Sequence, residues 1–398
     1  MSKILQKSPI NLKSKSIAGI TAILVAALFY AILVIDDQMI TIGGGAILAV
    51  IAFFASKKQN FRISFIQTLT TEKKLIIIIG ILFMLLLPLT LRKQPYLMHI
   101  LITSGISIIL ALGLNLQVGS TGIPNLGYAA FYGVGAYTSS ILATRLGLPF
   151  WIVLLIAGVV AGFFAFLVAL PTLKTRTYHL ALVSIAFGLV TYIMLNNLEF
   201  TGGPNGIKNI PPPQIFGWSF LENLRIFGKP YPMQFNYYYL VVIVVALLGI
   251  VAHFLYQSRI GLYWNAIRED EIAAKCSGIN IGSAKLLSFF IGGAFAGIAG
   301  SLYSHYIAYI SPENFNMNIS LLILAMVIMG GMDNIWGVAI GAVVLTLFPE
   351  KFRSLADFRM VASGLIIILM LMFRPTGIIK QQIRQYKHLF AARAARPE

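Results

Sequence analysis

Charged residues are scarce in this chain. Asp, Glu, Lys and Arg make up 11% of its 398 residues, whereas hydrophobic residues make up 58%, and the mean hydropathy is +0.84. This balance excludes a soluble globular domain of the same length. Apolar runs of about 20 residues, the length that crosses roughly 30 Å of hydrocarbon, recur along the chain. The sequence therefore predicts an all-α, polytopic integral membrane protein.

Cysteine is almost absent. Cys276 is the single cysteine, which excludes an internal disulfide and a cysteine metal cage, and a small residue on a helix face is its simplest interpretation. The five histidines show no metal-ligand spacing, and the chain contains no GxxxxGKS or GxxxxGKT phosphate-binding loop. We therefore expect no metal site, no cofactor and no ATP site of that type on this chain.

Acidic residues are rare within the apolar runs. A proton- or sodium-driven carrier usually has an ionisable residue or a cation cage at mid-membrane. Asp333 and Glu350 are the nearest candidates, and both are interpreted as interfacial residues. This scarcity counts against a stand-alone secondary carrier, although that alternative stays open. An intramembrane enzyme is disfavoured further, because no nucleophile and base pair appears at membrane depth.

Twelve apolar spans are predicted. The two spans from 319 to 350 are short and meet at a glycine-rich turn, so we expect tilted or broken helices there and about 10–12 transmembrane helices in total. Residues 1–95 form an extension with about three of these helices, residues 96–375 form the core, and residues 376–398 form a basic tail. The spans lie at 17–35, 39–55, 75–91, 96–117, 124–144, 149–170, 178–197, 237–257, 286–308, 319–332, 335–350 and 358–373.

The distribution of Lys and Arg predicts the orientation of these spans. With the N-terminus in the cytoplasm, 21 of the 30 basic residues lie on the cytoplasmic side and 9 lie outside. This excess matches the positive-inside rule, which accounts for the net charge of +17 more simply than nucleic-acid binding does. We therefore expect both termini and the loop 258–285 in the cytoplasm, and the loop 198–236 outside.

The segment 258–278 is helical in pattern yet heavily charged, although it lies between two strongly apolar spans. Arg268, Glu269, Asp270 and Glu271 are consecutive, and Gly278 supplies a helix stop. Such a helix is predicted to face water, where its charges can bind a groove of a partner protein. A solvated charged loop without any partner is the alternative.

The segment 115–137 contains polar residues and glycines at membrane depth. A helix end at Gly119 and a restart at Pro124 are predicted, and such non-helical backbone is tolerated only where it lines an enclosed or wet cavity. Packing between helices is the alternative role for the glycines here and in the run 292–301. The residues predicted to line a translocation pathway are Asn115, Gln117, Asn125, Tyr128 and Tyr132.

The predicted outer loop 198–236 is long and rich in glycine and proline. A connection of this length usually has a function or is disordered. Its prolines favour a fixed, extended surface that suits docking of a soluble partner, and a passive ordered loop is the alternative. The proposed docking residues are Thr201, Gly202, Gly203, Pro204, Asn205 and Gly206.

Six ordered motifs together resemble a known family, the permease subunits of bacterial branched-chain amino acid ABC transporters, and specifically the larger of its two homologous permease types. The resemblance covers most of residues 96–375. The motifs are GLNLQVGSTGIPNLGYAAFYGVGAY (113–137), TGGPNGI (201–207), AIREDEIAAKCSGIN (266–280), GGAFAGIAGSLY (292–303), SPENF (311–315) and GGMDNIWGV (330–338).

The resemblance implies a permease subunit in the bacterial inner membrane that imports branched-chain or other neutral amino acids. Its implied partners are a second homologous permease, two subunits that bind ATP and Mg, and an external solute-binding protein, so this chain itself is not an enzyme. Import of urea or short amides is the nearest alternative, because related permeases differ little in these motifs.

The same resemblance implies that residues 271–278 dock against an ATPase subunit. In this chain an isoleucine separates the acid from the alanines, and the apolar and proline tail of the general motif is missing after Gly278. The residues implied in this coupling are Arg268, Glu269, Asp270, Glu271, Ala273, Ala274 and Gly278.

Overall fold

The computed structural model describes most of the predicted core. The chain divides into two compact units, residues 1–98 and 99–398. The predicted spans 17–35, 39–55 and 358–373, and the tail beyond residue 379, lie largely outside the described residues. The residues described are 27, 29–31, 73–171, 177–215, 217–226, 229–351, 364, 365, 368, 370, 372, 374 and 376–379.

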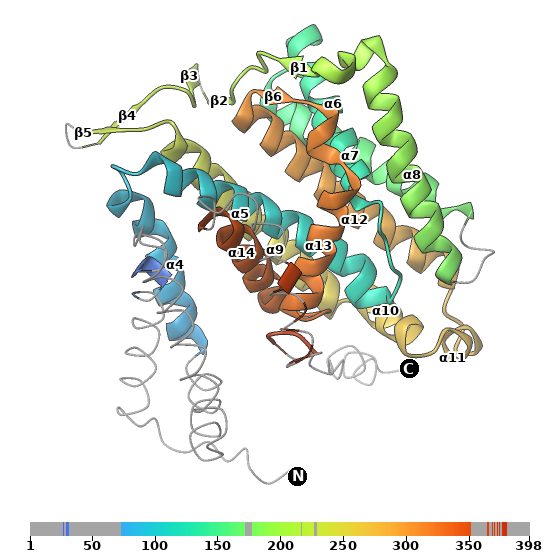
Figure 1. Ribbon diagram of the computed structural model, residues 1–398. Coiled ribbons are helices and arrows are strands. Elements are labelled where there is room, and N and C mark those ends of the chain that lie inside the picture. Colours follow the sequence, from blue (N-terminus) through green and yellow to red (C-terminus); the bar gives the residue numbers. More distant parts are fainter. Residues whose placement is uncertain are drawn as a thin grey trace, which may run out of the picture. The chain divides into compact units, whose positions relative to one another are not determined.

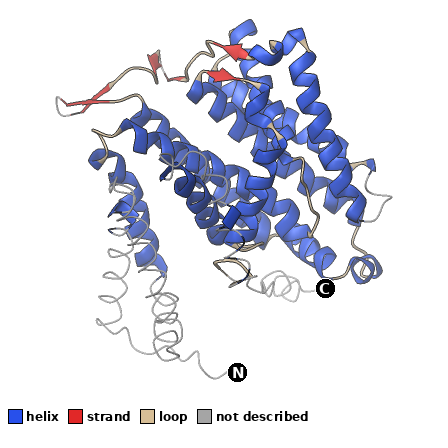
Figure 2. Ribbon diagram, viewed as in Figure 1, coloured by secondary structure: helices blue, strands red, loops and turns tan. Residues whose placement is uncertain are grey.

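Helices form nearly all the regular structure of the described residues, which confirms the all-α prediction (Figure 2). Nine predicted spans fall on helices, because long apolar runs satisfy their backbone polar groups internally. The helices are α4 (Lys73–Thr90), α5 (Pro95–Leu114), η1 (Asn115–Gly119), α6 (Tyr128–Leu146), α7 (Phe150–Ala169), α8 (Thr177–Asn197), α9 (Gln234–Gln257), α10 (Arg259–Glu269), α11 (Glu271–Cys276), α12 (Ile281–Ile307), α13 (Met317–Gly330) and α14 (Ile335–Lys351).

Several of these helices suit a membrane. Among the described residues, five helices are long and apolar enough to cross a bilayer, or six if α8 and the 3-10 turns after it, bent by 81°, count as one span. The helix α6 is not among the five, since it carries tyrosine, serine, threonine and glycine, and most of its residues are buried in the protein. Polar helices of this kind are tolerated where protein, and not lipid, surrounds them.

The helices α6, α7 and α12 pack together as the centre of the second unit (Figure 1). Small residues allow this close approach. A β-carbon on Gly135 of α6 would lie 2.3 Å from the Gly297 Cα of α12, and one on Gly297 would lie 2.4 Å from the Ala157 oxygen of α7. Neither position has room for a larger side chain, so packing accounts for these two glycines.

Short strands gather at one end of the second unit, whereas α10 and α11 lie at the other end (Figure 1). The segment that connects α8 and α9 carries five strands and crosses back over α6 and α7. There Arg145 donates a hydrogen bond to the Phe200 carbonyl at 2.6 Å, and Trp151 donates one to the Gln214 carbonyl at 3.0 Å. The antiparallel pairs are β1 (Ile207–Lys208) with β6 (Tyr309–Ile310), β2 (Gln214–Ile215) with β3 (Trp218–Ser219), and β4 (Leu224–Ile226) with β5 (Lys229–Tyr231).

The helices α13 and α14 form a tight pair. The 14-residue α13 and the 3-10 turn before it, Pro312–Phe315, together form one of the five candidate spans. The 17 residues of α14 correspond to about 26 Å of helix, shorter than the roughly 30 Å of a hydrocarbon core. A β-carbon on Gly330 would lie 2.3 Å from the Gly337 oxygen, so glycine permits this contact. The amides of Ile378 and Ile379 donate to the carbonyls of Met329 and Gly330 at 2.9 and 3.2 Å, which satisfies the last turn of α13.

Candidate functional site

The helix α5 changes its winding where the polar segment begins. Residues Asn115–Gly119 form the π-turn η1, a rare geometry that often marks functional sites. Helical backbone continues to Thr121, and α6 begins at Tyr128. The predicted helix end at Gly119 and restart at Pro124 were therefore displaced, by two and four residues. The predicted break itself is present, as a non-helical stretch over residues 122–127.

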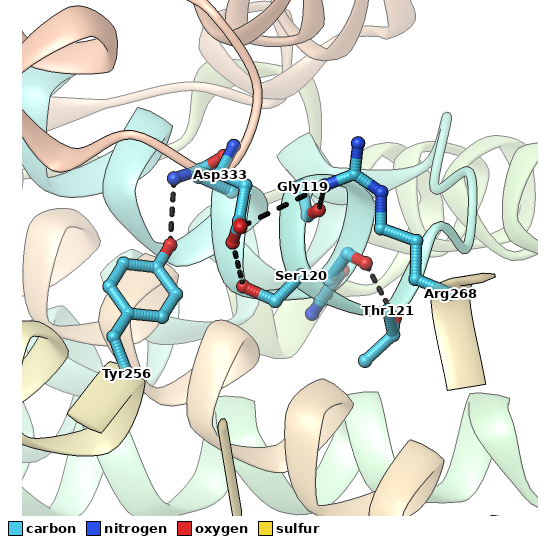
Figure 3. A network of polar contacts seen from close by, with 8 residues as sticks. Gly119, Ser120, Thr121, Tyr256, Arg268 and Asp333 are labelled. Carbon is cyan, nitrogen blue, oxygen red and sulfur yellow. Dashed lines mark hydrogen bonds and ion pairs between the residues drawn. The ribbon is translucent and has the colours of Figure 1, made fainter. Parts of the chain in front are cut away.

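Three segments that are distant in the sequence meet beside η1 (Figure 3). Ser120 donates a hydrogen bond to Asp333 Oδ1 at 2.9 Å, and the Asp333 amide donates to Asn115 Oδ1 at 2.8 Å. The Asn115 side-chain amide in turn donates to the Tyr256 hydroxyl at 2.7 Å. This network joins η1 to the end of α9 and to the turn between α13 and α14.

Asp333, which was predicted to be interfacial, lies buried within the protein. Its side chain has no exposed surface, and its backbone adopts a left-handed conformation with φ of 66°. The residue precedes the N-terminus of α14, whose dipole stabilises a negative charge. Sequence reasoning missed this site because the hydrogen-bond partner Ser120 lies 213 residues away in the chain.

Arg268 supplies the opposite charge. Its guanidinium Nη1 lies 3.9 Å from Asp333 Oδ2 and also donates a hydrogen bond to the Gly119 carbonyl (Figure 3). The Arg268 side chain is 19% exposed, so its charged end points into the protein and not outward. A residue predicted to contact a partner protein therefore lies against η1 and the α13–α14 turn.

The predicted single helix at 258–278 is two helices, α10 and α11. They meet at Asp270, whose carboxylate accepts hydrogen bonds from the amides of Ile272 and Ala273 at 2.8 and 3.0 Å. Aspartate is a favoured N-cap because it satisfies amides that the first turn leaves without partners. Ser258 caps α10 in the same manner, and Gly278 follows α11 with φ of 80°, as the predicted helix stop requires.

The surface of α11 is largely open to solvent. Ile272 is 77% exposed, which is unusual for a large apolar side chain that lies on a charged loop. Glu271 pairs with Lys285 at 2.8 Å, and its side chain is 46% exposed. Among the other residues predicted for coupling, Ala274 is buried, whereas the exposed ones are Glu269, Asp270, Ala273 and Gly278.

The predicted pathway residues are all buried, and three of them converge on α12. Gln117 donates a hydrogen bond to the Phe289 carbonyl at 3.3 Å, and Tyr128 donates one to the Gly292 carbonyl at 2.7 Å. Asn125 donates to Gln117 Oε1 at 2.7 Å. These side chains therefore tie the broken segment 115–128 to the first half of α12.

The other two predicted pathway residues are separate from that group. Asn115 belongs to the network around Asp333, whereas Tyr132 lies in an aromatic cluster further along α6. The Tyr132 ring centroid is 5.7 Å from that of Tyr303 and 5.0 Å from that of Phe315. The structure thus distributes the five predicted residues over three places in the second unit.

The predicted docking residues lie at the opposite end from α10 and α11. Thr201 is buried and donates hydrogen bonds to the carbonyls of Leu195 and Leu198. Gly206 has φ of 65°, and a β-carbon there would lie 1.9 Å from the Ile310 oxygen. Gly203 is also buried, so the solvent-facing residues of this set are Gly202, Pro204 and Asn205.

Side chains that could bind a metal ion do not cluster in the part of the chain that the structure describes. No three side chains of His, Cys, Asp or Glu lie together there in a way that would hold a metal ion. His305 is buried and bonds to the Pro211 carbonyl at 2.6 Å and to Ser139 Oγ at 3.0 Å. The polar groups of the site are thus engaged in holding helices together.

The buried polar network that joins the broken helix to the α10–α11 pair thus lies among helices that are long and apolar enough to cross a membrane. The family model described as "Branched-chain amino acid transport system / permease component" matches residues 96–373. The chain belongs to this family. A comparison with solved structures finds no significant match.

Relatives with assigned names agree with the family. The chain is 39% identical over 295 residues to the high-affinity branched-chain amino acid transport system permease protein LivM of Escherichia coli K12, with 71% of this chain and 69% of that protein covered. It is 26% identical over 289 residues to LivH of the same organism, which bears the same description, with 68% and 90% covered. The chain thus resembles the LivM type more strongly than the LivH type, as the motifs implied.

Proposed function

We propose that this chain is the larger permease subunit of an ATP-driven importer of branched-chain amino acids. The family match over residues 96–373 carries the proposal, and the relatives' names specify branched-chain amino acids. Those names do not favour the alternative of urea or short amides. The subunit forms part of the pathway for the amino acid through the membrane, and ATP is hydrolysed on other chains.

A second permease subunit is proposed as a partner because the relatives include two types of permease. LivM and LivH are both named as permeases of the same transport system in Escherichia coli K12, and this chain is similar to both. A homologous second permease therefore pairs with this chain in the proposed importer. Two ATPase subunits, which hold ATP and Mg, and an external solute-binding protein complete it.

The two ends of the second unit suit these two kinds of partner. The exposed Ile272 and Glu271 on α11 offer an apolar and a charged contact to an ATPase on the cytoplasmic side. Pro204 and Asn205 offer a surface to a solute-binding protein on the outer side. In this arrangement both termini are cytoplasmic, and the chain lies in the inner membrane of a bacterium.

Affinity purification tests this proposal. The tagged chain is extracted from its native membrane, and the proteins that accompany it are identified. A homologous permease and ATPases with phosphate-binding loops are expected, and vesicles containing the set are expected to take up leucine only with ATP. Recovery of this chain alone, together with uptake that needs no ATP, would establish a secondary carrier instead. Competition by excess urea or acetamide would overturn the assigned solute class.

A further inference from the structure

Four residues from three segments of the second unit meet at one place, which we call the Arg268 junction: Gly119, Ser120, Arg268 and Asp333. Gly119 ends the π-turn and Ser120 follows it, Arg268 lies near the end of α10, and Asp333 lies in the α13–α14 turn. The proposed ATPase surface on α11 begins three residues after Arg268. The junction is therefore the place where that surface connects to the interior.

The Arg268 contact with the Gly119 carbonyl is favoured by helix geometry. Carbonyl groups at the end of a helix have no partner within the helix, and a cation there interacts favourably with the helix dipole. The π-turn brings the Gly119 carbonyl to the Arg268 guanidinium. Arg268 thereby fixes the end of α10 to the end of η1.

The Asp333 contact adds a third segment. Its carboxylate is fully buried, and a buried charge is costly unless an opposite charge and hydrogen bonds compensate it. Arg268 supplies the charge at 3.9 Å, and the Ser120 hydroxyl supplies a hydrogen bond at 2.9 Å. Displacement of α10 away from the turn would separate this carboxylate from the Arg268 charge.

The helix α10 is also attached to α12. The Trp264 side chain is fully buried, and its indole nitrogen donates a hydrogen bond to the Ala284 carbonyl at 2.8 Å. Trp264 and Arg268 are four residues apart and so lie on the same face of α10. One face of α10 is therefore fixed to α12, to η1 and to the α13–α14 turn.

We propose that the Arg268 and Asp333 side chains form the link that transmits displacement of α10 and α11 to the π-turn and to the α13–α14 turn. Arg268 is a positioning residue, because it acts through the segments it connects. The inference rests on the proposed function, since the displacement comes from ATPase subunits. Rigid-body movement of this kind is an established route of coupling in other proteins.

The test compares uptake with hydrolysis. The complete transporter is reconstituted in vesicles with its solute-binding protein, and leucine uptake and ATP hydrolysis are measured together for Arg268→Gln. Loss of a charged hydrogen bond predicts that uptake falls about ten-fold while basal hydrolysis stays within about two-fold. The ratio of leucine transported to ATP hydrolysed falls accordingly, and solute-loaded binding protein no longer stimulates hydrolysis.

Matched variants distinguish loss of the Arg268–Asp333 link from a general loss of structure. Arg259→Gln removes the same charge from an exposed position of α10 and is expected to keep the wild-type ratio. Asp333→Asn is expected to reproduce Arg268→Gln, and the double variant is expected to be no worse than either single variant, as for residues that act together. Arg268→Lys keeps the charge but not the planar fork, so an intermediate ratio is expected.

Two results for Arg268→Gln would contradict the proposed link. A wild-type ratio in Arg268→Gln overturns the link, and so does a proportional fall of uptake and hydrolysis, which indicates a structural role alone. If Arg268→Gln does not assemble, Ser120→Ala decides by the same ratio: a reduced ratio supports the link and an unchanged one overturns it. Absence of ATP-dependent uptake in the wild type would count against the proposed function itself.

Discussion

A β-carbon on Gly119 would lie 2.6 Å from the backbone nitrogen of Asp333 and 2.0 Å from Asn115 Oδ1. The α13–α14 turn therefore approaches η1 through the space that a side chain would occupy. Glycine at residue 119 is a steric requirement of this approach, and the three segments of the junction depend on it.

Replacement of Gly119 by alanine is expected to disrupt this approach. Overpacking of this kind typically costs about 1–3 kcal/mol, and here it forces Asp333 or Asn115 to move. We expect lower leucine uptake and a lower melting temperature of the purified transporter. Gly249→Ala is the matched control, because no atom lies within 4 Å of its β-carbon position. Equal behaviour of the two variants would contradict the steric account.

Reversal of the Glu271 and Lys285 charges distinguishes two roles of Glu271. The pair is partly exposed, so on its own it contributes only about 0–1 kcal/mol. If Glu271 contacts an ATPase, as proposed, Glu271→Lys abolishes uptake and the added change Lys285→Glu does not restore it. Uptake assays in cells measure both variants at equal membrane abundance. Restored uptake in the reversed pair would show that Glu271 serves Lys285 alone.

Ile272 provides a test of the apolar part of the same surface. Its exposed side chain is expected to be buried in an ATPase groove, and complete burial of an isoleucine contributes about 1.5–3 kcal/mol. Ile272→Ala should therefore reduce the amount of ATPase that purifies with the tagged chain. Ile250→Ala removes the same atoms from an exposed position on α9, where no loss is expected. Unchanged recovery with Ile272→Ala would exclude this contact.

The outer loop is tested at Gly206. Its backbone conformation, with φ of 65° and ψ of −159°, is accessible almost only to glycine, and a side chain would also collide with the Ile310 oxygen. In Gly206→Ala we expect a higher half-saturating concentration of the solute-binding protein with little change in maximal uptake. Gly217→Ala shares the positive φ but has open space around its β-carbon. A shift of the same size in both variants would rule out a specific role of the contact with Ile310.

The centre of the second unit is tested at Gly297. A β-carbon there would lie 2.4 Å from the Ala157 oxygen, which belongs to the backbone of a packed helix and cannot rotate away. Gly297→Ala should separate α12 from α7 and lower the melting temperature of the transporter, at a cost of about 1–3 kcal/mol. Gly249→Ala again serves as the control. A variant as stable as that control would show that these helices have freedom to shift.

The sequence predicted the helices of the core because each buries its own backbone polar groups, so the signal is local. The runs 149–170 and 237–257, for example, correspond closely to α7 and α9. The division at Asp270 was missed, although an aspartate before Glu271 and two alanines is a pattern typical of an N-cap. The apolar and charged periodicity of one long helix concealed that signal.

The environment of Asp333 was beyond local reasoning. Its neighbours Ser120 and Arg268 come from other loops, and sequence spacing alone does not reveal which loops meet. The winding of η1 was missed for the same reason, since Asn115 and Gln117 have their hydrogen-bond partners on α9 and α12. Two charged residues that were predicted to lie at an interface, Arg268 and Asp333, thus pair with each other inside the protein.

The helix α12 has both of its ends anchored. Its 27 residues, Ile281–Ile307, correspond to about 40 Å of continuous helix. Near its first end the Ala284 carbonyl accepts a hydrogen bond from Trp264, and near its last end His305 contacts the Pro211 carbonyl. This single helix therefore connects the helix pair α10–α11 to the loop that carries the proposed docking residues. If binding of a partner at one end changes the position of α12, thermodynamic reciprocity requires that the two partners affect each other's binding equally. Binding of the solute-binding protein would then change the affinity of the ATPase for the permease by a certain factor. Binding of the ATPase would change the affinity of the solute-binding protein for the permease by the same factor.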